Sequence, residues 1–127
     1  MTIQECYAAL GADYEGTLHR LSMDALVHKF ALYFLEDDSF ATLSAAMEAQ
    51  DYEVAFRASH TLKGVCLNLG FTKLHEASSD LTEAMRDGKK LEDMSLYEKV
   101  REEYNRTVEM IKALDLFVCL GRRDYMK

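Results

Sequence analysis

The amino-acid sequence predicts an all-α protein, an antiparallel up-and-down four-helix bundle with short N-terminal capping helices. Its 127 residues include no proline, a residue that helix interiors exclude and that turns and edge strands often contain. Apolar residues recur every three or four positions, and no stretch alternates with the period of two that is typical of a strand. Short connections make successive helices antiparallel, and 49% apolar residues are enough for the core of one domain.

Two short helices are predicted at the N-terminus, where they cover one end of the bundle. Thr2 and Glu5 match the capping-box pattern for the first helix, which ends near Gly11. The second helix runs from Asp13 to about Arg20.

Residues 22–118 are assigned to the bundle, in which four helices are long. Its first helix begins at Ser22, and the chain restarts a helix within Asp37–Ser39. A long helix then begins at Asp51 and ends at Gly70, because glycine is the preferred residue just past a helix end. The apolar face of the first bundle helix comprises Leu26, Val27, Phe30, Ala31 and Phe34.

The last two helices of the bundle follow the same periodicity. The first of them closes at Gly88, and Ser95 with Glu98 forms a capping box near the start of the second. The apolar positions of this last helix are Leu96 or Tyr97, Val100, Tyr104, Val108, Ile111, Leu114 and Val118. Residues 1–21 are therefore a cap, and residues 119–127 form a tail.

Charge and composition exclude several function classes. With 15 Lys and Arg against 22 Asp and Glu, the formal net charge is −7, whereas a nucleic-acid-binding face is clustered and basic. No apolar run approaches the roughly 20 residues that span a bilayer, and the N-terminus lacks the features of a signal peptide. Three widely spaced cysteines do not suggest a disulfide framework, and no metal-ligand spacing is present. We expect a cytoplasmic monomer, a single domain over residues 1–127, that binds neither nucleic acid nor a membrane.

The helix predicted over residues 51–69 has two distinct faces. At about 100° per residue, His60 falls nearly opposite the core face, so we expect it to point to solvent. The core face comprises Ala55, Ala58, Leu62, Val65, Cys66 and Leu69. The outward face around the histidine comprises Glu53, Phe56, Arg57, Lys63, Gly64, Leu67 and Asn68.

The chemistry of the outward face centres on His60. Its neutral imidazole nitrogen is a nucleophile, and Gly64, one turn further on, removes a side chain that would crowd it, although a mid-helix glycine costs about 1 kcal/mol relative to alanine. Lys63 reaches the same space and would balance an attached phosphoryl group. Phe56 and Leu67 offer a partner an apolar contact. The alternative is that His60 is a plain surface residue and that the two apolar side chains pack beneath a neighbouring helix.

The run from His60 to Gly70 reads His-Thr-Leu-Lys-Gly-Val-Cys-Leu-Asn-Leu-Gly. It resembles the signature of histidine-containing phosphotransfer (HPt) domains, which is His-x-x-Lys-Gly followed by a small-to-apolar stretch and Leu-Gly. The resemblance extends over roughly residues 22–118, and the first 20 residues resemble the N-terminal cap of the family. It implies a four-helix bundle that accepts a phosphoryl group on a histidine from a receiver-domain aspartate and passes it to another receiver aspartate.

The resemblance also implies a role for each site residue. His60 would be the phosphorylated nucleophile, through Nε2, with Lys63 as its electrostatic support and Gly64 as the residue that gives clearance. The residues implied for partner binding are Phe56, Arg57, Leu67 and Asn68. The chain lacks the ATP-binding motifs of a histidine kinase, so we expect a phosphocarrier and not an enzyme. The implied partners are receiver domains of response regulators and a hybrid histidine kinase. No cofactor is expected on the chain, and Mg²⁺ is expected on the partner receiver.

Two other function classes stand beside the phosphocarrier. The first is a non-catalytic helical adaptor that binds a signalling partner through the face formed by Phe56 and Leu67. The second is a metal- or cofactor-binding bundle, which the sequence disfavours because such sites need inward-facing Glu and Glu-x-x-His pairs.

Overall fold

The computed structural model describes residues 1–114, and all regular structure within this range is helical. The helices are α1 (Ile3–Leu10), α2 (Tyr14–Leu21), α3 (Asp24–Tyr33), α4 (Ser39–Glu48), α5 (Tyr52–Leu69), α6 (Thr72–Ala84) and α7 (Ser95–Lys112). Short 3₁₀ turns follow two of them, η1 (Phe34–Glu36) after α3 and η2 (Arg86–Gly88) after α6. The predicted all-α bundle with short N-terminal helices is confirmed.

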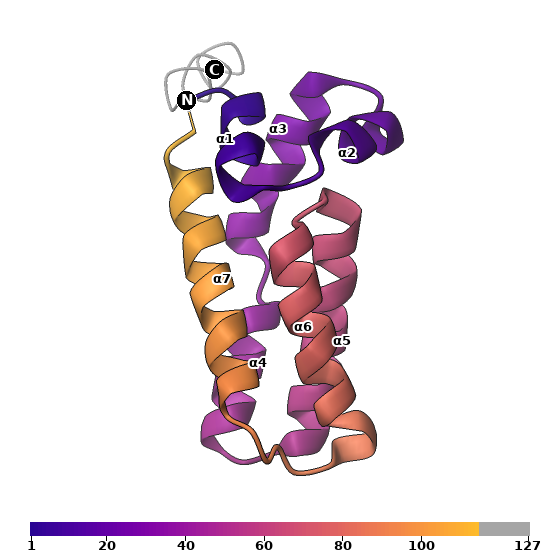
Figure 1. Ribbon diagram of the computed structural model, residues 1–127, viewed down its shortest axis with the longest axis vertical. Helices are drawn as coiled ribbons and strands as arrows, with labels where there is room; N and C mark the ends of the chain where they lie inside the picture. The colour runs from indigo at the N-terminus through magenta and orange to yellow at the C-terminus, as the bar shows by residue number, and fades with distance from the viewer. Residues whose placement is uncertain (115–127) are drawn as a thin grey trace.

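Helices α4 to α7 lie along the long axis of the molecule, and α1, α2 and α3 gather at one end of it (Figure 1). Neighbours in sequence pack on each other: α4 on α5, α5 on α6 and α6 on α7. The predicted restart within Asp37–Ser39 is confirmed, because α3 and α4, of 10 residues each, are separate helices on one side of the bundle. The break lies at Asp37, whose carboxylate accepts a hydrogen bond from the N–H of Ser39 at 3.0 Å and so starts α4.

Several predicted helix ends are confirmed. The Thr2 hydroxyl accepts from the N–H of Glu5 at 3.1 Å, and the Glu5 carboxylate accepts from the N–H of Thr2 at 2.8 Å, which completes the capping box. Asp51 caps α5 by accepting from the N–H of Val54 at 3.2 Å. At its other end, α5 stops at Gly70, which has the left-handed φ of 74°.

Two predicted caps are wrong. Ser22 does not begin α3 but ends α2 in a left-handed conformation, with a φ of 73°, and the N-cap of α3 is Met23 without a side-chain hydrogen bond. Ser95 does not form a capping box with Glu98. Instead, the carboxylate of Asp93 accepts from both the N–H and the hydroxyl of Ser95, because an aspartate two residues upstream closes a local turn.

The last two helices are shorter than predicted. Helix α6 ends at Ala84 and not at Gly88, since η2 follows it. Helix α7 ends at Lys112, where the N–H of Leu114 bonds to the carbonyl oxygen of Ile111 at 3.0 Å and the tightened turn buries Leu114. The predicted continuation to Val118 lies outside the described residues.

The core of the bundle contains the predicted stripe of α5. Five of its six residues are buried and Val65 is half-buried, so the opposite face of α5 is turned to solvent. The prediction for α3 is wrong at Phe30, which is 38% exposed. Only a narrow stripe of α3 packs inward, formed by Val27, His28 and Ala31.

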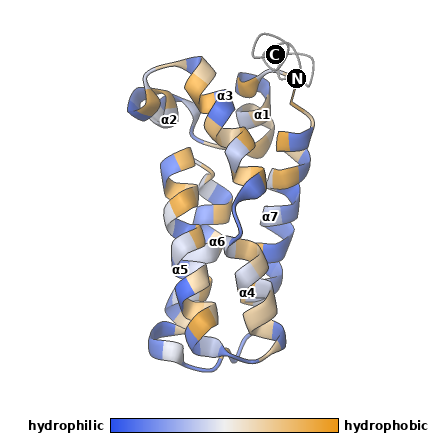
Figure 2. Ribbon diagram, turned by 180° about the vertical axis from the view of Figure 1, so that it is seen from behind, coloured by the Kyte–Doolittle hydropathy of each residue, from blue (hydrophilic) through white to orange (hydrophobic). Residues whose placement is uncertain are grey.

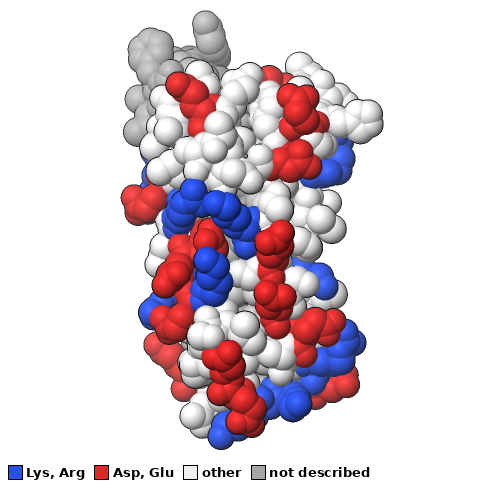
Figure 3. Space-filling view, in the orientation of Figure 1, with Lys and Arg blue, Asp and Glu red and all other residues white. Residues whose placement is uncertain are grey.

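Most polar and charged residues lie on the sides of the helices that are exposed to solvent. Hydrophilic residues predominate along α7 (Figure 2), and its buried positions recur every three or four residues from Tyr97 to Ile111. On the face drawn in Figure 3, basic side chains lie among acidic ones. Along α7, Glu103 forms ion pairs with Lys99 and Arg106. Within residues 1–114, no helix combines the length and apolar character that a membrane span requires.

Candidate functional site

His60 lies on the solvent face of α5, as predicted, and its side chain is exposed. Its ring stacks beside that of Phe56, with 6.4 Å between the centroids and 27° between the planes. Phe56 is half-buried and packs against the core, so it supports one side of the imidazole and presents only part of its own ring to solvent. The outward direction predicted for His60 is confirmed, and Phe56 combines the two predicted alternatives, because it packs partly against the core and stays partly open to a partner.

Gly64, one turn beyond His60 on α5, faces open space. A Cβ atom at this position would meet no side chain and no other helix within 4 Å. A methyl group there would therefore not touch the His60 ring itself. The space that glycine leaves is instead available to a group that approaches the imidazole from outside the protein.

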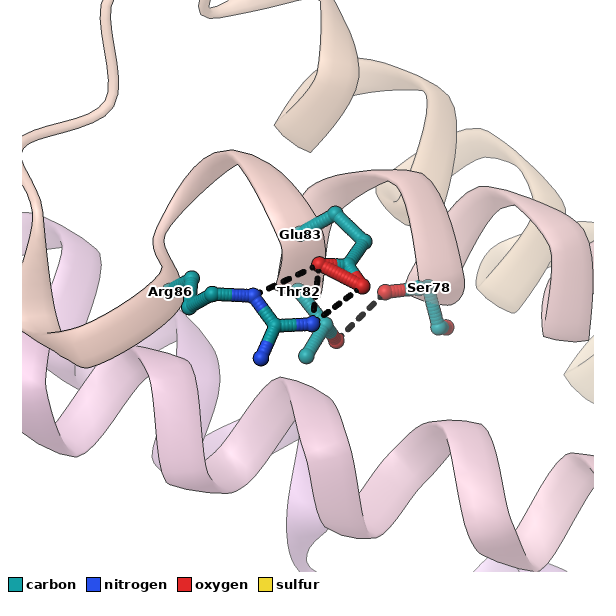
Figure 4. A network of polar contacts seen from close by, with 4 residues as sticks. All are labelled: Ser78, Thr82, Glu83 and Arg86. Atoms are coloured by element: carbon teal, nitrogen blue, oxygen red, sulfur yellow. Dashed lines mark hydrogen bonds and ion pairs between the residues drawn. The ribbon is translucent and has the colours of Figure 1, made fainter.

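The two cations of the face differ in their surroundings. Arg57 forms an exposed ion pair with Glu53 at 3.2 Å, so its charge is largely balanced within α5. Lys63 is half-buried, and its charge reaches Glu83 of α6. The pKa of Glu83 is lowered, first by its hydrogen bonds with Arg86 (Figure 4), then by the charge of Arg86, and also by the charge of Lys63. Lys63 is thus the cation that this face offers to an anion.

An apolar area continues from α5 onto α3. Leu67 of α5 is 58% exposed, and Tyr33 and Phe30, which line a groove between α3 and α5, are 50% and 38% exposed. The two aromatic rings of α3 meet edge-on, with centroids 5.6 Å apart. The groove is lined by Phe30, Tyr33, Phe34, Asp37, Val65, Asn68 and Leu69. Of the predicted docking residues, Asn68 therefore shares this groove with an aromatic pair, of which Phe30 is a predicted core residue.

The carboxyl end of α5 is fixed by the N-terminal helices. The guanidinium of Arg20 donates to the carbonyl oxygens of Leu67 and Asn68 at 3.1 and 3.0 Å. The Tyr7 hydroxyl donates to the carbonyl oxygen of Leu69 at 2.6 Å. These bonds satisfy carbonyl groups that a helix end leaves without partners, and the cation also suits the negative end of the helix dipole. No sequence pattern indicates these contacts, because the partners are about 50 to 60 residues apart.

The cysteines within the described residues take no part in the site. Cys6 and Cys66 are both fully buried, and burial raises the pKa of each thiol, to about 11 for Cys6. A protonated, buried thiol is a poor nucleophile, so neither Cys6 nor Cys66 is a candidate for the chemistry of this site. Cys119 lies outside the described residues.

Fold and site together define a small helical domain that presents a histidine, rather than a substrate cleft, to whatever approaches it. A family model described as the Hpt domain matches residues 36–114, which is more than half of the chain, and the chain belongs to this family. Hpt domains are phosphocarrier modules of two-component phosphorelays; they have no kinase activity and interact with receiver domains and histidine kinases. No curated protein and no solved structure matches the chain.

Proposed function

We propose that His60 accepts a phosphoryl group from the phospho-aspartate of a receiver domain and passes it to the aspartate of another receiver. The observation that carries this proposal is the exposed imidazole beside a half-buried lysine and an open glycine on one face of α5. In the accepting step, the lone pair of Nε2 attacks phosphorus while the P–O bond to the aspartate breaks. The carboxylate leaves with that electron pair, and Nδ1 keeps its proton. The onward step is the reverse reaction with a second carboxylate as nucleophile.

The chain would contribute position and one charge to this reaction. Phosphoryl transfer depends on in-line approach and on balancing the charge of the phosphoryl oxygens. Lys63 can balance part of that charge, and the open space at Gly64 admits the incoming phospho-aspartate. We assign Mg²⁺ to the receiver, which would bring the rest of the electrostatic stabilisation.

The test is phosphoryl labelling by a receiver. The purified chain is mixed with receiver domains that have been phosphorylated with acetyl phosphate, and acid-labile, base-stable phosphate is followed on the chain. We expect labelling of the wild type and none of His60→Gln. Labelling that persists in His60→Gln would overturn the assignment. Binding of receivers without any labelling would favour the non-catalytic adaptor.

We further propose that the receiver docks on the area formed by Leu67, Asn68, Phe30 and Tyr33 and also contacts Phe56 and Arg57, which lie on the other side of His60 along α5. Exposed aromatic and aliphatic side chains around a groove are typical of the centre of a protein interface. Because Arg57 is already paired with Glu53, its removal should matter less than removal of Leu67.

This docking surface is tested with Leu67→Ala and a matched control. Leu67 is exposed, so the substitution should leave the free energy of unfolding within about 0.5 kcal/mol of wild type. It should raise the Kd for a receiver by about tenfold, as measured by isothermal calorimetry. The control is Met94→Ala, which removes a 49% exposed apolar side chain just before α7, at the opposite end of the bundle (Figure 1). Equal effects of the two substitutions would contradict the proposed surface.

A further inference from the structure

The turn of α5 that carries His60 is attached to α6 on its N-terminal side by a buried hydroxyl. Ser59, the residue before His60, is fully buried. Its hydroxyl donates to the carbonyl oxygen of Ser78 at 3.1 Å and lies 2.7 Å from Oγ1 of Thr82. The Thr82 hydroxyl donates to the same carbonyl oxygen at 2.6 Å (Figure 4), so this oxygen of α6 accepts hydrogen bonds from two hydroxyl groups.

A second attachment lies one turn further along α5. Nδ1 of His75, on α6, is 3.1 Å from the carbonyl oxygen of Lys63. A carbonyl oxygen can only accept, so Nδ1 must carry the proton. The neutral Nδ1–H form and the charged ring both meet this requirement, and the bond therefore holds whichever of the two is present.

These attachments control the rotation of α5 about its own axis. Both helices also bury small and apolar side chains, such as Ala55 and Cys66 of α5 and Ala77 of α6, and apolar packing is not directional. Hydrogen bonds are directional. One of the two sites is at Ser59, just before His60, and the other is at the carbonyl group of Lys63. A rotation of about 20° would move a side chain on the helix surface by about 2 Å. A misplacement of only about 1 Å can slow a transfer step by about a hundredfold.

We propose that Ser59 and His75 are positioning residues for phosphoryl transfer, which hold the imidazole of His60 and the ammonium of Lys63 in the setting that allows in-line attack. The inference rests on the proposed role of His60. It assigns a function to α6 that goes beyond closing the core, because α6 sets the direction in which α5 presents its reactive face.

The experiment compares two substitutions of His75. In His75→Asn, an amide N–H occupies nearly the position of the Nδ1–H, whereas His75→Phe keeps a ring without a donor. Transfer from a receiver phosphorylated with acetyl phosphate is measured under single-turnover conditions over a range of receiver concentrations. We expect His75→Phe to lower the maximal rate by about tenfold at an unchanged half-saturating concentration, and His75→Asn to restore it. A wild-type maximal rate in His75→Phe, or an equal loss in His75→Asn, would overturn the proposal.

A second pair of variants, and an NMR measurement on the protein without a receiver, distinguish a loss of positioning from a folding defect. Thr82→Val removes the hydroxyl partner of Ser59 at equal volume, and Thr82→Ser keeps it; the first should slow transfer and the second should not. In NMR spectra of the free protein, His75→Phe should shift the ring resonances of His60 and leave those of His19, on α2, in place. Unshifted His60 resonances would count against the proposal. Failure of the wild type to accept phosphate would instead refute the proposed function, so the two failures are distinguishable.

Discussion

Gly64 lies in the interior of α5, where a glycine makes the helix less stable than an alanine would. Glycine in a helix interior costs about 1 kcal/mol relative to alanine, because the chain loses more conformational freedom on folding. No close neighbour requires a glycine there, since a Cβ atom would meet nothing within 4 Å. The remaining explanation is that an encounter with another molecule needs the space beside His60.

Gly64→Ala should therefore separate stability from function. We expect the free energy of unfolding to rise by about 0.5 to 1 kcal/mol, from a better helix former and a less flexible unfolded chain. Phosphoryl transfer should become slower, because the methyl group occupies the approach to the imidazole. Urea unfolding measures the first effect, and single-turnover transfer from a phosphorylated receiver measures the second. A variant that is stabilised and transfers at the wild-type rate would show that Gly64 has no clearance role.

At the residue scale, the sequence predicts which face of a helix a side chain lies on better than it predicts which residues of other helices that side chain contacts. Helical periodicity correctly places His60 on the solvent side of α5, because 100° per residue leaves little choice once the core stripe is known. It does not reveal that the charge of Lys63 helps to lower the pKa of Glu83, a residue of another helix. It also does not show that His75 of α6 reaches the backbone of Lys63. Such contacts depend on how two helices pack, and no local pattern encodes them.

At the scale of elements, α5 is held at its carboxyl end by the N-terminal helices. The junction is Gly70, whose own carbonyl oxygen accepts from the N–H of Asp13 at 2.8 Å. A Cβ atom on Gly70 would lie 2.3 Å from Oγ1 of Thr17 and 2.6 Å from the carbonyl oxygen of Asp13. A glycine is thus needed at position 70 for two reasons: its backbone is left-handed, and α2 approaches it too closely for a side chain.

The substitutions Gly70→Ala and Gly11→Ala form a matched pair. Both glycines have a positive φ, of 74° and 64°, so alanine costs about 1 kcal/mol at either position from the backbone alone. At Gly11 the added carbon would meet only the flexible end of Lys73, at 3.3 Å. At Gly70 it would meet backbone, so we expect an additional loss of at least about 2 kcal/mol in urea unfolding. Equal losses in the two variants would mean that α2 does not pack on Gly70 as described.

Element boundaries show where reasoning from sequence succeeds and where it fails. Capping patterns within one turn are local, and the capping box of Thr2 and the caps at Asp51 and Gly70 are confirmed. The pattern fails at Ser95, where Asp93 competes for the same groups, and at Phe30, where α3 packs at the end of the bundle and buries a narrower stripe. Competition between neighbouring polar side chains and the width of a buried face are both decided by tertiary packing.

At the scale of the whole molecule, α1 joins the cap to the main core through two ionisable groups. Cys6 and Tyr7 are fully buried, and the ring of Tyr7 lies 5.5 Å from that of Phe71, at the start of α6. Burial raises the pKa of the Cys6 thiol from 9.0 to about 11, and burial also raises the pKa of the Tyr7 hydroxyl. In the unfolded chain, both groups would release their protons at lower pH than in the folded protein.

The stability of the protein should therefore fall in alkaline solution. A group whose pKa is raised by folding contributes its full stabilisation below its unfolded pKa, and that contribution is lost as the pH rises towards the folded pKa. For Cys6, the loss begins near pH 9 and continues to about pH 11. Urea unfolding at a series of pH values should thus give a flat free energy up to about pH 8.5 and a decline above it.

Cys6→Ala isolates the contribution of one buried group to this decline. The variant should lose some stability at neutral pH from the missing sulfur, but its free energy of unfolding should fall less steeply between pH 9 and 11. Because Cys6 lies in the cap and the measurement reports on the whole chain, the gentler slope should appear equally in the helical circular dichroism and in the fluorescence of the tyrosines. Parallel curves for wild type and variant would show that Cys6 is not buried as described. Different slopes for the two probes would show that the cap unfolds separately from the bundle that presents His60.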